Sequence, residues 1–248
     1  FSAANFLQYS NSLRVVRATQ TNAVNASTSG TGVLVKNTDD WTNNYASGGQ
    51  AGNATFVARE AGTDGNNLQV STCPNAAAYE EEGATTVNDA STAVGDTVVV
   101  TASGAALNVG DIISFSTTAA TNDYDDGEQY RVTNIATNDV TIVQHPRGTG
   151  GLKRALTDGS NIRRRWKYYD AVDGAPGTST YVSERNGAND EIHVVVIDED
   201  GGISGVPGTI LETFSKLSKA SDAKDPQGND NYYPNVIYTK SQYIYWTK

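Results

Sequence analysis

The sequence predicts an α+β protein in which a discontinuous mixed α/β core domain is interrupted by an inserted antiparallel β-barrel or β-sandwich domain. The first observation is charge: residues 80–145 hold eleven acidic residues and one basic residue, whereas the rest of the 248-residue chain holds seventeen of each. The second is periodicity, which changes in the same stretch to short β-branched runs separated by turn residues. We therefore assign residues 1–79 and 151–248 to the core and residues 80–150 to the insertion.

The first flank predicts a short helix around Phe6 and Leu7, followed by a strand over residues 12–18. Two further apolar runs, residues 56–58 and 68–70, predict strands on either side of a turn at residues 62–67. That turn is rich in glycine and asparagine, which favour turn conformations.

The acidic stretch predicts four short strands, because β-branched and aromatic residues dominate residues 97–101, 111–115, 129–133 and 140–143. Pairs of glycine with aspartate, or asparagine with aspartate, separate these runs at turn-like spacing. Many short strands with regular turns are typical of a small antiparallel barrel or sandwich.

The second flank contains the strongest strand pattern in the chain, at residues 191–197. Residues 198–202 form a turn pattern that reverses this strand into a hairpin. The apolar residues between 210 and 217 suit one face of a helix, but their β-branched neighbours leave a strand equally open. Residues 243–246 predict a last strand.

We predict no catalytic residues, no cofactor and no metal, and therefore no enzyme. The single cysteine, Cys73, excludes an internal disulfide, and His145 and His193 are too few for a convincing zinc or haem site. The glycine-rich segment at 148–153 lacks the spacing of a phosphate-binding loop, and the residues around Ser204 lack the second glycine of a nucleophile elbow. A pI near 4.6 argues against nucleic acid, and no apolar run is long enough to insert in a membrane.

Three acidic groups have a functional and a structural interpretation. Asp198 and Asp200 could bind calcium, but the further oxygen ligands are missing, so a solvated hairpin turn is favoured. Residues 80–82 are three glutamates, which favour a solvated face or linker over paired catalytic acids. The loop from Asp123 to Glu128 is the basis of a hydrolase hypothesis, which ranks last.

One basic cluster, formed by Arg163, Arg164, Arg165 and Lys167, is the candidate contact site. In an acidic chain, it is expected to pair with acids of a neighbouring surface or subunit, ahead of a solvated segment. Two tyrosine pairs, at 168–169 and 232–233, could stack on sugars, although half-buried packing is the commoner role.

Several segments of the flanks resemble contractile phage tail sheath proteins, most closely those of T4-like myoviruses. The resemblance covers about residues 1–75 and 185–248, and the order and spacing of its motifs make it specific. The matching segments are residues 6–18, 56–68, 198–201, 212–218, 222–224, 231–237 and 241–244.

This resemblance implies a structural subunit of a virion, made in the host cytoplasm, that forms hexameric rings around a tail tube. It implies contraction that drives the tube through the host envelope, with other sheath subunits, the tube protein, the baseplate and the tail terminator as partners. Sheath subunits are joined by terminal arms that add strands to a neighbour's sheet. In T4-like sheaths an inserted β-barrel domain protrudes outward, and residues 80–150 fall at that position.

The chain has no methionine and begins at Phe1, so we expect a central fragment of a longer protein, monomeric without its arms. The alternative hypothesis is a carbohydrate-binding or host-adhesion module of a phage structural protein, based on the tyrosine pairs and the acidic β stretch.

Overall fold

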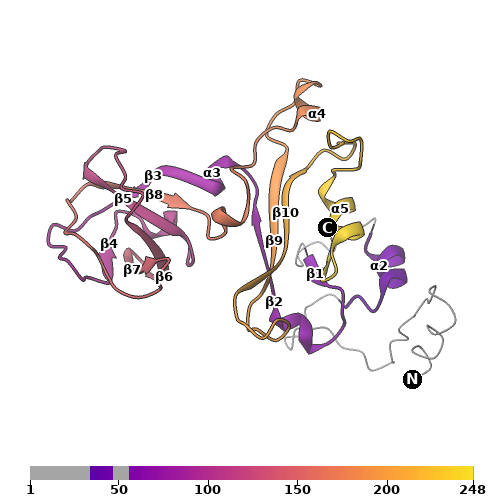
Figure 1. Ribbon diagram of the computed structural model, residues 1–248, viewed down its shortest axis with the longest axis horizontal. Helices are drawn as coiled ribbons and strands as arrows, with labels where there is room; N and C mark the ends of the chain where they lie inside the picture. Colours follow the sequence, from indigo (N-terminus) through magenta and orange to yellow (C-terminus); the bar gives the residue numbers. More distant parts are fainter. Residues whose placement is uncertain (1–33, 47–55, 248) are drawn as a thin grey trace. The chain divides into compact units, whose positions relative to one another are not determined.

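The computed structural model describes residues 34–46 and 56–247, which form three β-sheets and a few short helices (Figure 1). The chain divides into two compact units. The first consists of the described residues of Phe1–Val70 with Val196–Leu211 and Pro234–Lys248, and the second of Ser71–Val195 and Glu212–Tyr233.

The largest element of the second unit is a six-stranded sheet with the order β3-β8-β5-β6-β7-β4. All five neighbouring pairs are antiparallel. The strands are β3 (Glu80–Thr86), β4 (Val98–Val100), β5 (Ile112–Ala119), β6 (Gln129–Ala136), β7 (Asp139–His145) and β8 (Ser160–Arg165). Four of these strands, β4, β5, β6 and β7, confirm the strand predictions. The β-branched and aromatic residues of these runs fit a pleated, partly buried surface.

The core of this sheet consists of inward-facing aliphatic and aromatic side chains. Tyr130 and Phe115 pack with ring centroids 5.6 Å apart. The cluster comprises Val87, Val99, Leu107, Ile113, Phe115, Tyr130, Val132, Val140, Ile142, Leu152, Leu156 and Ile162. Three of its members follow residue 150, so the core and the sheet continue to Arg165.

The prediction left a barrel or a sandwich open, and the barrel is wrong, because this sheet does not close. Its edge strands β3 and β4 are joined next to their ends by one bridge, between Val87 and Thr101, and not by a ladder. A bulge in β3, where Gly83 takes a φ of +64°, bends the edge strand. Bulges of this kind increase local twist and interrupt the hydrogen-bonding edge.

The predicted mixed α/β core is also not found in the described residues, which are mostly β. Their helices are short: α2 (Thr38–Asn44), α3 (Ala76–Tyr79), α4 (Thr180–Ser183) and α5 (Tyr233–Lys240), with 3₁₀ turns at Thr63–Asn67, Gly104–Ala106 and Tyr169–Ala171. The predicted helix and strand of residues 6–18 lie outside the described residues. Within 34–46 and 56–247, no helix has the length and hydrophobicity needed to cross a membrane.

In the first unit, β1 (Phe56–Ala58) pairs with β11 (Ile244–Trp246), which confirms both strand predictions. Trp41 of α2 stacks on Tyr238 of α5 at 4.4 Å and donates its indole N–H to the carbonyl oxygen of Trp246 at 2.9 Å. Two segments far apart in the sequence thus form one aromatic core.

A three-stranded sheet has the order β10-β9-β2, from β2 (Leu68–Cys73), β9 (Glu191–Asp198) and β10 (Thr209–Ser218). The predicted strand and hairpin turn at 191–202 are confirmed, and β10 resolves the open choice at 210–217 in favour of a strand. The β-branched residues there fit an extended backbone better than a helix.

Candidate functional site

The basic cluster predicted as a contact site lies on and just after β8, next to β3 and β5 in the sheet order. Arg163 is buried, forms an ion pair with Asp126 and has its guanidinium 4.6 Å from the ring centroid of Tyr124. The hydrogen bond from Arg163 is the main cause that lowers the pKa of Asp126, and it outweighs the opposing effect of burial. This arginine is therefore held inside its own sheet.

The next two arginines alternate in direction, as successive residues of a strand do. Arg165 donates to Glu80 and lies 3.5 Å from Asp126. Arg164 donates to Glu81 at 3.1 Å and to the carbonyl oxygen of Ala77 at 2.8 Å. The acidic partners expected for the cluster thus lie in the same chain. Contact with another subunit stays a prediction, with Lys167 as the exposed member of the four.

Lys167 places its ammonium 4.9 Å from the ring centroid of Tyr168. Tyr168 itself is buried and packs edge-to-face on Trp166 at 5.5 Å. Tyr232 and Tyr233 are half-buried and pack against each other at 5.5 Å. These tyrosines take the packing role that is commoner than sugar stacking.

The acids of the loop from Asp123 to Glu128 are engaged in hydrogen bonds and ion pairs. Hydrogen bonds from Thr117 and Thr121 lower the pKa of Asp123. Glu128 forms an ion pair with Arg154 at 2.9 Å. A general acid needs a raised pKa, so the lowered pKa values of Asp123 and Asp126 speak against the hydrolase hypothesis.

Asp198, the first residue of the calcium hypothesis, is buried and acts as a loop cap. Its Oδ2 accepts the backbone N–H groups of Ile203 at 3.0 Å and Ser204 at 2.6 Å, and the Ser204 hydroxyl at 2.7 Å. In the part of the chain that the structure describes, no group of three or more His, Cys, Asp or Glu side chains could hold a metal.

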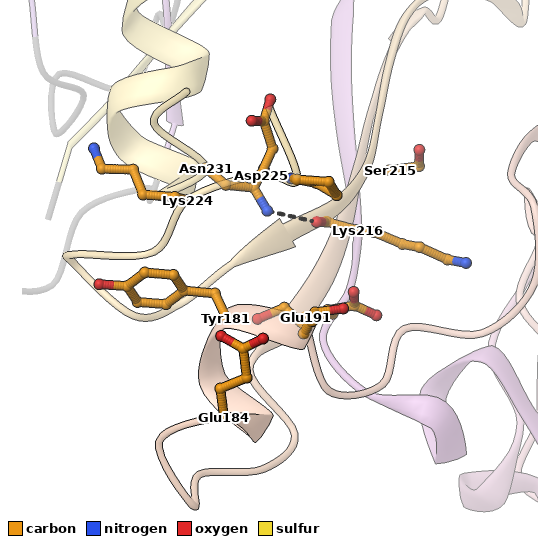
Figure 2. Close-up of a pocket in the computed structure, with 11 residues that line it drawn as sticks. Tyr181, Glu184, Glu191, Ser215, Lys216, Lys224, Asp225 and Asn231 are labelled. Carbon is orange, nitrogen blue, oxygen red and sulfur yellow. Dashed lines mark hydrogen bonds between the residues drawn. The ribbon is translucent and has the colours of Figure 1, made fainter. Parts of the chain in front are cut away.

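A polar cleft in the second unit was not foreseen from the sequence (Figure 2). Its volume is about 680 Å³, and its walls come from α4, the start of β9, the end of β10 and the loop before α5. The lining residues are Ser179, Thr180, Tyr181, Glu184, Glu191, Ser215, Lys216, Lys224, Asp225, Pro226 and Asn231. Acids, lysines, hydroxyls and an amide therefore line one open cleft.

One buried carboxylate, Asp190, fixes two walls of the cleft. It accepts the backbone N–H and the hydroxyl of Ser179, both at 2.8 Å, and the hydroxyl of Ser218. Burial opposes ionisation of Asp190, but these hydrogen bonds outweigh it and lower its pKa. Ser179 also caps α4, so Asp190 ties the start of this helix to the end of β10.

Sequence reasoning missed the cleft because its residues come from a four-residue helix, two strand ends and a loop, which share no periodicity. It also missed the β3–β8 pair, although a signal exists. Glu80 and Glu81 face Arg165 and Arg164 in reverse order, as opposite charges on antiparallel strands do.

Comparison with known proteins gave no match to a family model, to a curated protein or to a solved structure.

Proposed function

We propose that this chain is the central part of a structural subunit of a contractile phage tail sheath, which polymerises around the tail tube and contracts to drive it through the host envelope. In this proposal the flanks belong to a discontinuous core domain, and the six-stranded sheet is an insertion that protrudes from it. The proposed partners are other copies of the subunit, the tail tube, the baseplate and the tail terminator.

The observation that carries the proposal is where the six-stranded sheet begins and ends. Its first residue, Glu80, is the register partner of its last, Arg165. Tyr79 and Trp166, the residues just outside the sheet, are also joined: the backbone N–H of Trp166 donates to the carbonyl oxygen of Tyr79 at 2.8 Å. The chain thus leaves and returns at one point, as expected for a domain inserted in another.

Closure of the first unit from distant segments also supports the proposal, since β1 pairs with β11 while β2 to β10 lie between them in sequence. The charge supports it less strongly than the sequence suggested. Residues 80–165 hold twelve acids and seven bases, a net charge of −5, which is half of the total imbalance. An acidic outer surface would still limit adhesion between assembled particles.

Electron microscopy of the complete protein that contains this chain tests the proposal. We expect striated tubular polymers that exist in a long narrow form and a short wide form. Particles that remain monomeric in all conditions, or globular enzymatic assemblies, would contradict it.

Deletion of the sheet tests the insertion itself. Residues 80–165 are removed, and Tyr79 is joined to Trp166 through an Asn-Gly linker, which can be short because the backbone N–H of Trp166 already donates to the carbonyl oxygen of Tyr79. Polymerisation is expected to persist. The matched control inserts the same Asn-Gly dipeptide between Asp123 and Tyr124 of the intact sequence and deletes nothing. Loss of polymers in the deletion and not in the control would contradict a peripheral role.

The alternative, a carbohydrate-binding or host-adhesion module, is favoured by one observation, the polar cleft with Tyr181 in its wall. Binding of host surface polysaccharide, abolished by a Tyr181→Ala variant and accompanied by no polymer formation, would select it.

A further inference from the structure

His193 of β9 lies directly behind one wall of the cleft and uses both of its ring nitrogens. The Lys216 backbone N–H donates to Nδ1 at 2.9 Å, and Nε2 lies 3.0 Å from the carbonyl oxygen of Gly174. A backbone N–H can only donate, so Nδ1 must be unprotonated and the proton must sit on Nε2. The side chain is fully buried, so in the folded state both ring nitrogens depend on these two partners.

Lys216, the residue that His193 holds, has an unusual backbone. Its φ is +52°, a left-handed backbone conformation that residues other than glycine rarely adopt. Its N–H is held by His193, and its carbonyl oxygen accepts the Asn231 amide at 3.1 Å, as the dashed line in Figure 2 shows. Strained residues of this kind persist where neighbours fix them on both sides.

The surroundings of His193 favour the neutral ring. Burial lowers its pKa below the ordinary value of 6.5, while the Gly174 carbonyl and Glu191 of β9 raise it and Lys216 of β10 lowers it. The other facing groups are aromatic: Trp166 stacks at 6.4 Å and Tyr79 of α3 lies edge-on at 6.3 Å. No further charged group among the described residues contributes to its titration.

We propose that His193 is a proton-operated latch for the cleft: a proton taken from solvent onto Nδ1 replaces the Lys216 N–H···Nδ1 bond and frees Ser215 and Lys216, one wall of the cleft, from β9. Protonation turns the acceptor into a second donor, so two N–H groups then point at each other. Lys216 can leave its left-handed conformation, and its bond to Asn231 breaks with it. The latch goes beyond the proposed sheath function and does not depend on it.

Nuclear magnetic resonance of the 248-residue chain, titrated from about pH 7.5 to about pH 5, tests the latch. We expect His193 as the Nε2–H tautomer at the upper pH and a titration midpoint below 6.5. The Lys216 backbone amide and the Asn231 side-chain amide should shift with the same midpoint. Hydrogen-exchange protection of the Lys216 amide should fall at least about tenfold when His193 is protonated.

A His193→Asn variant removes the titration but keeps an acceptor near the Nδ1 position, so its Lys216 amide should not respond to pH. A His145→Gln variant, which removes the other histidine, should respond as the unaltered chain does. Amides of Val132 and Val140, in the six-stranded core, should keep their protection throughout.

Four results would overturn the latch. They are an Nδ1–H tautomer, a midpoint at or above 6.5, Lys216 and Asn231 amides that do not follow His193, and loss of protection at Val132 and Val140 with the same midpoint. The last of these would mean general acid unfolding. The unaltered chain decides each of them, even if His193→Asn fails to fold.

Discussion

Arg59 should be the residue that holds the two distant segments of the first unit together. Its guanidinium donates to the carbonyl oxygens of Ile244 at 3.1 Å, Ile237 at 3.3 Å and Tyr238. It also lies 4.3 Å from the ring centroid of Tyr245. The perturbation is Arg59→Ala, which removes one side chain that reaches 185 residues along the sequence.

The magnitude follows from the bonds lost. Hydrogen bonds from a charged group contribute about 1.5 kcal/mol each at the lower end of their range. Two of the three bonds, to Ile244 and Tyr238, give about 3 kcal/mol. The bond to Ile237 is not counted separately, because it is long and shares its nitrogen with the bond to Tyr238. The stacking on Tyr245 adds to this, and water that reaches the half-buried site subtracts from it. A loss of about 3 kcal/mol corresponds to about a hundredfold change in an opening equilibrium.

Hydrogen exchange followed by mass spectrometry measures this opening locally, in peptides that cover residues 56–60 and 237–246. We expect about a hundredfold loss of protection in both peptides of the variant. The matched control is Arg185→Ala: this guanidinium also lies on a tyrosine ring, 3.6 Å from the Tyr181 centroid, but its side chain is 53% exposed. The control should change protection less than threefold, because exposed pairs contribute below about 0.5 kcal/mol. Equal losses of protection in the two variants, or a loss below threefold for Arg59→Ala, would show that Arg59 does not hold the two segments together.

Three further predictions concern the second unit. Ile162 is fully buried, so Ile162→Ala should lower the free energy of unfolding in urea by about 3 kcal/mol; a loss below about 1 kcal/mol contradicts its place in the core. Asp190 has a folded-state pKa below its ordinary value of 3.8. Its ionised form therefore stabilises the fold fully above about pH 3.8, and this stabilisation is lost as the pH falls through the folded-state pKa. The difference in melting temperature between the unaltered chain and Asp190→Asn should therefore shrink in acid, and a constant difference speaks against the ionised hydrogen-bonded form. Burial raises the pKa of the Cys73 thiol to about 11, so an aromatic disulfide reagent should react with it only after denaturation, and fast reaction of the native chain contradicts this.

The strands rich in β-branched and aromatic residues were predictable, whereas the two charged strands were not. Residues 191–197 and 129–133 carry their strand signal in their own side chains, so β9 and β6 were located correctly. The charged strands are β3 (Glu80–Thr86) and β8 (Ser160–Arg165). Each has few apolar residues, so each by its own composition resembles a solvated segment. Each becomes a strand because the other supplies the opposite charge.

The same effect explains why the predicted boundary at residue 150 and the end of the sheet differ. A count of net charge ends the acidic stretch at the first basic residues. Opposite charges attract, however, so the basic strand β8 belongs beside the acidic strand β3, and the sheet extends to Arg165.

The sequence alone specifies which short segments are extended and where the chain turns, because side-chain periodicity and turn residues act within a few positions. It also determined the acidic character and the small number of histidines and cysteines. The tertiary structure decided which strands are neighbours, which acids neutralise the arginines of β8, and which nitrogen of His193 holds its proton. Each of these depends on contacts between residues tens to hundreds of positions apart, which no local pattern encodes.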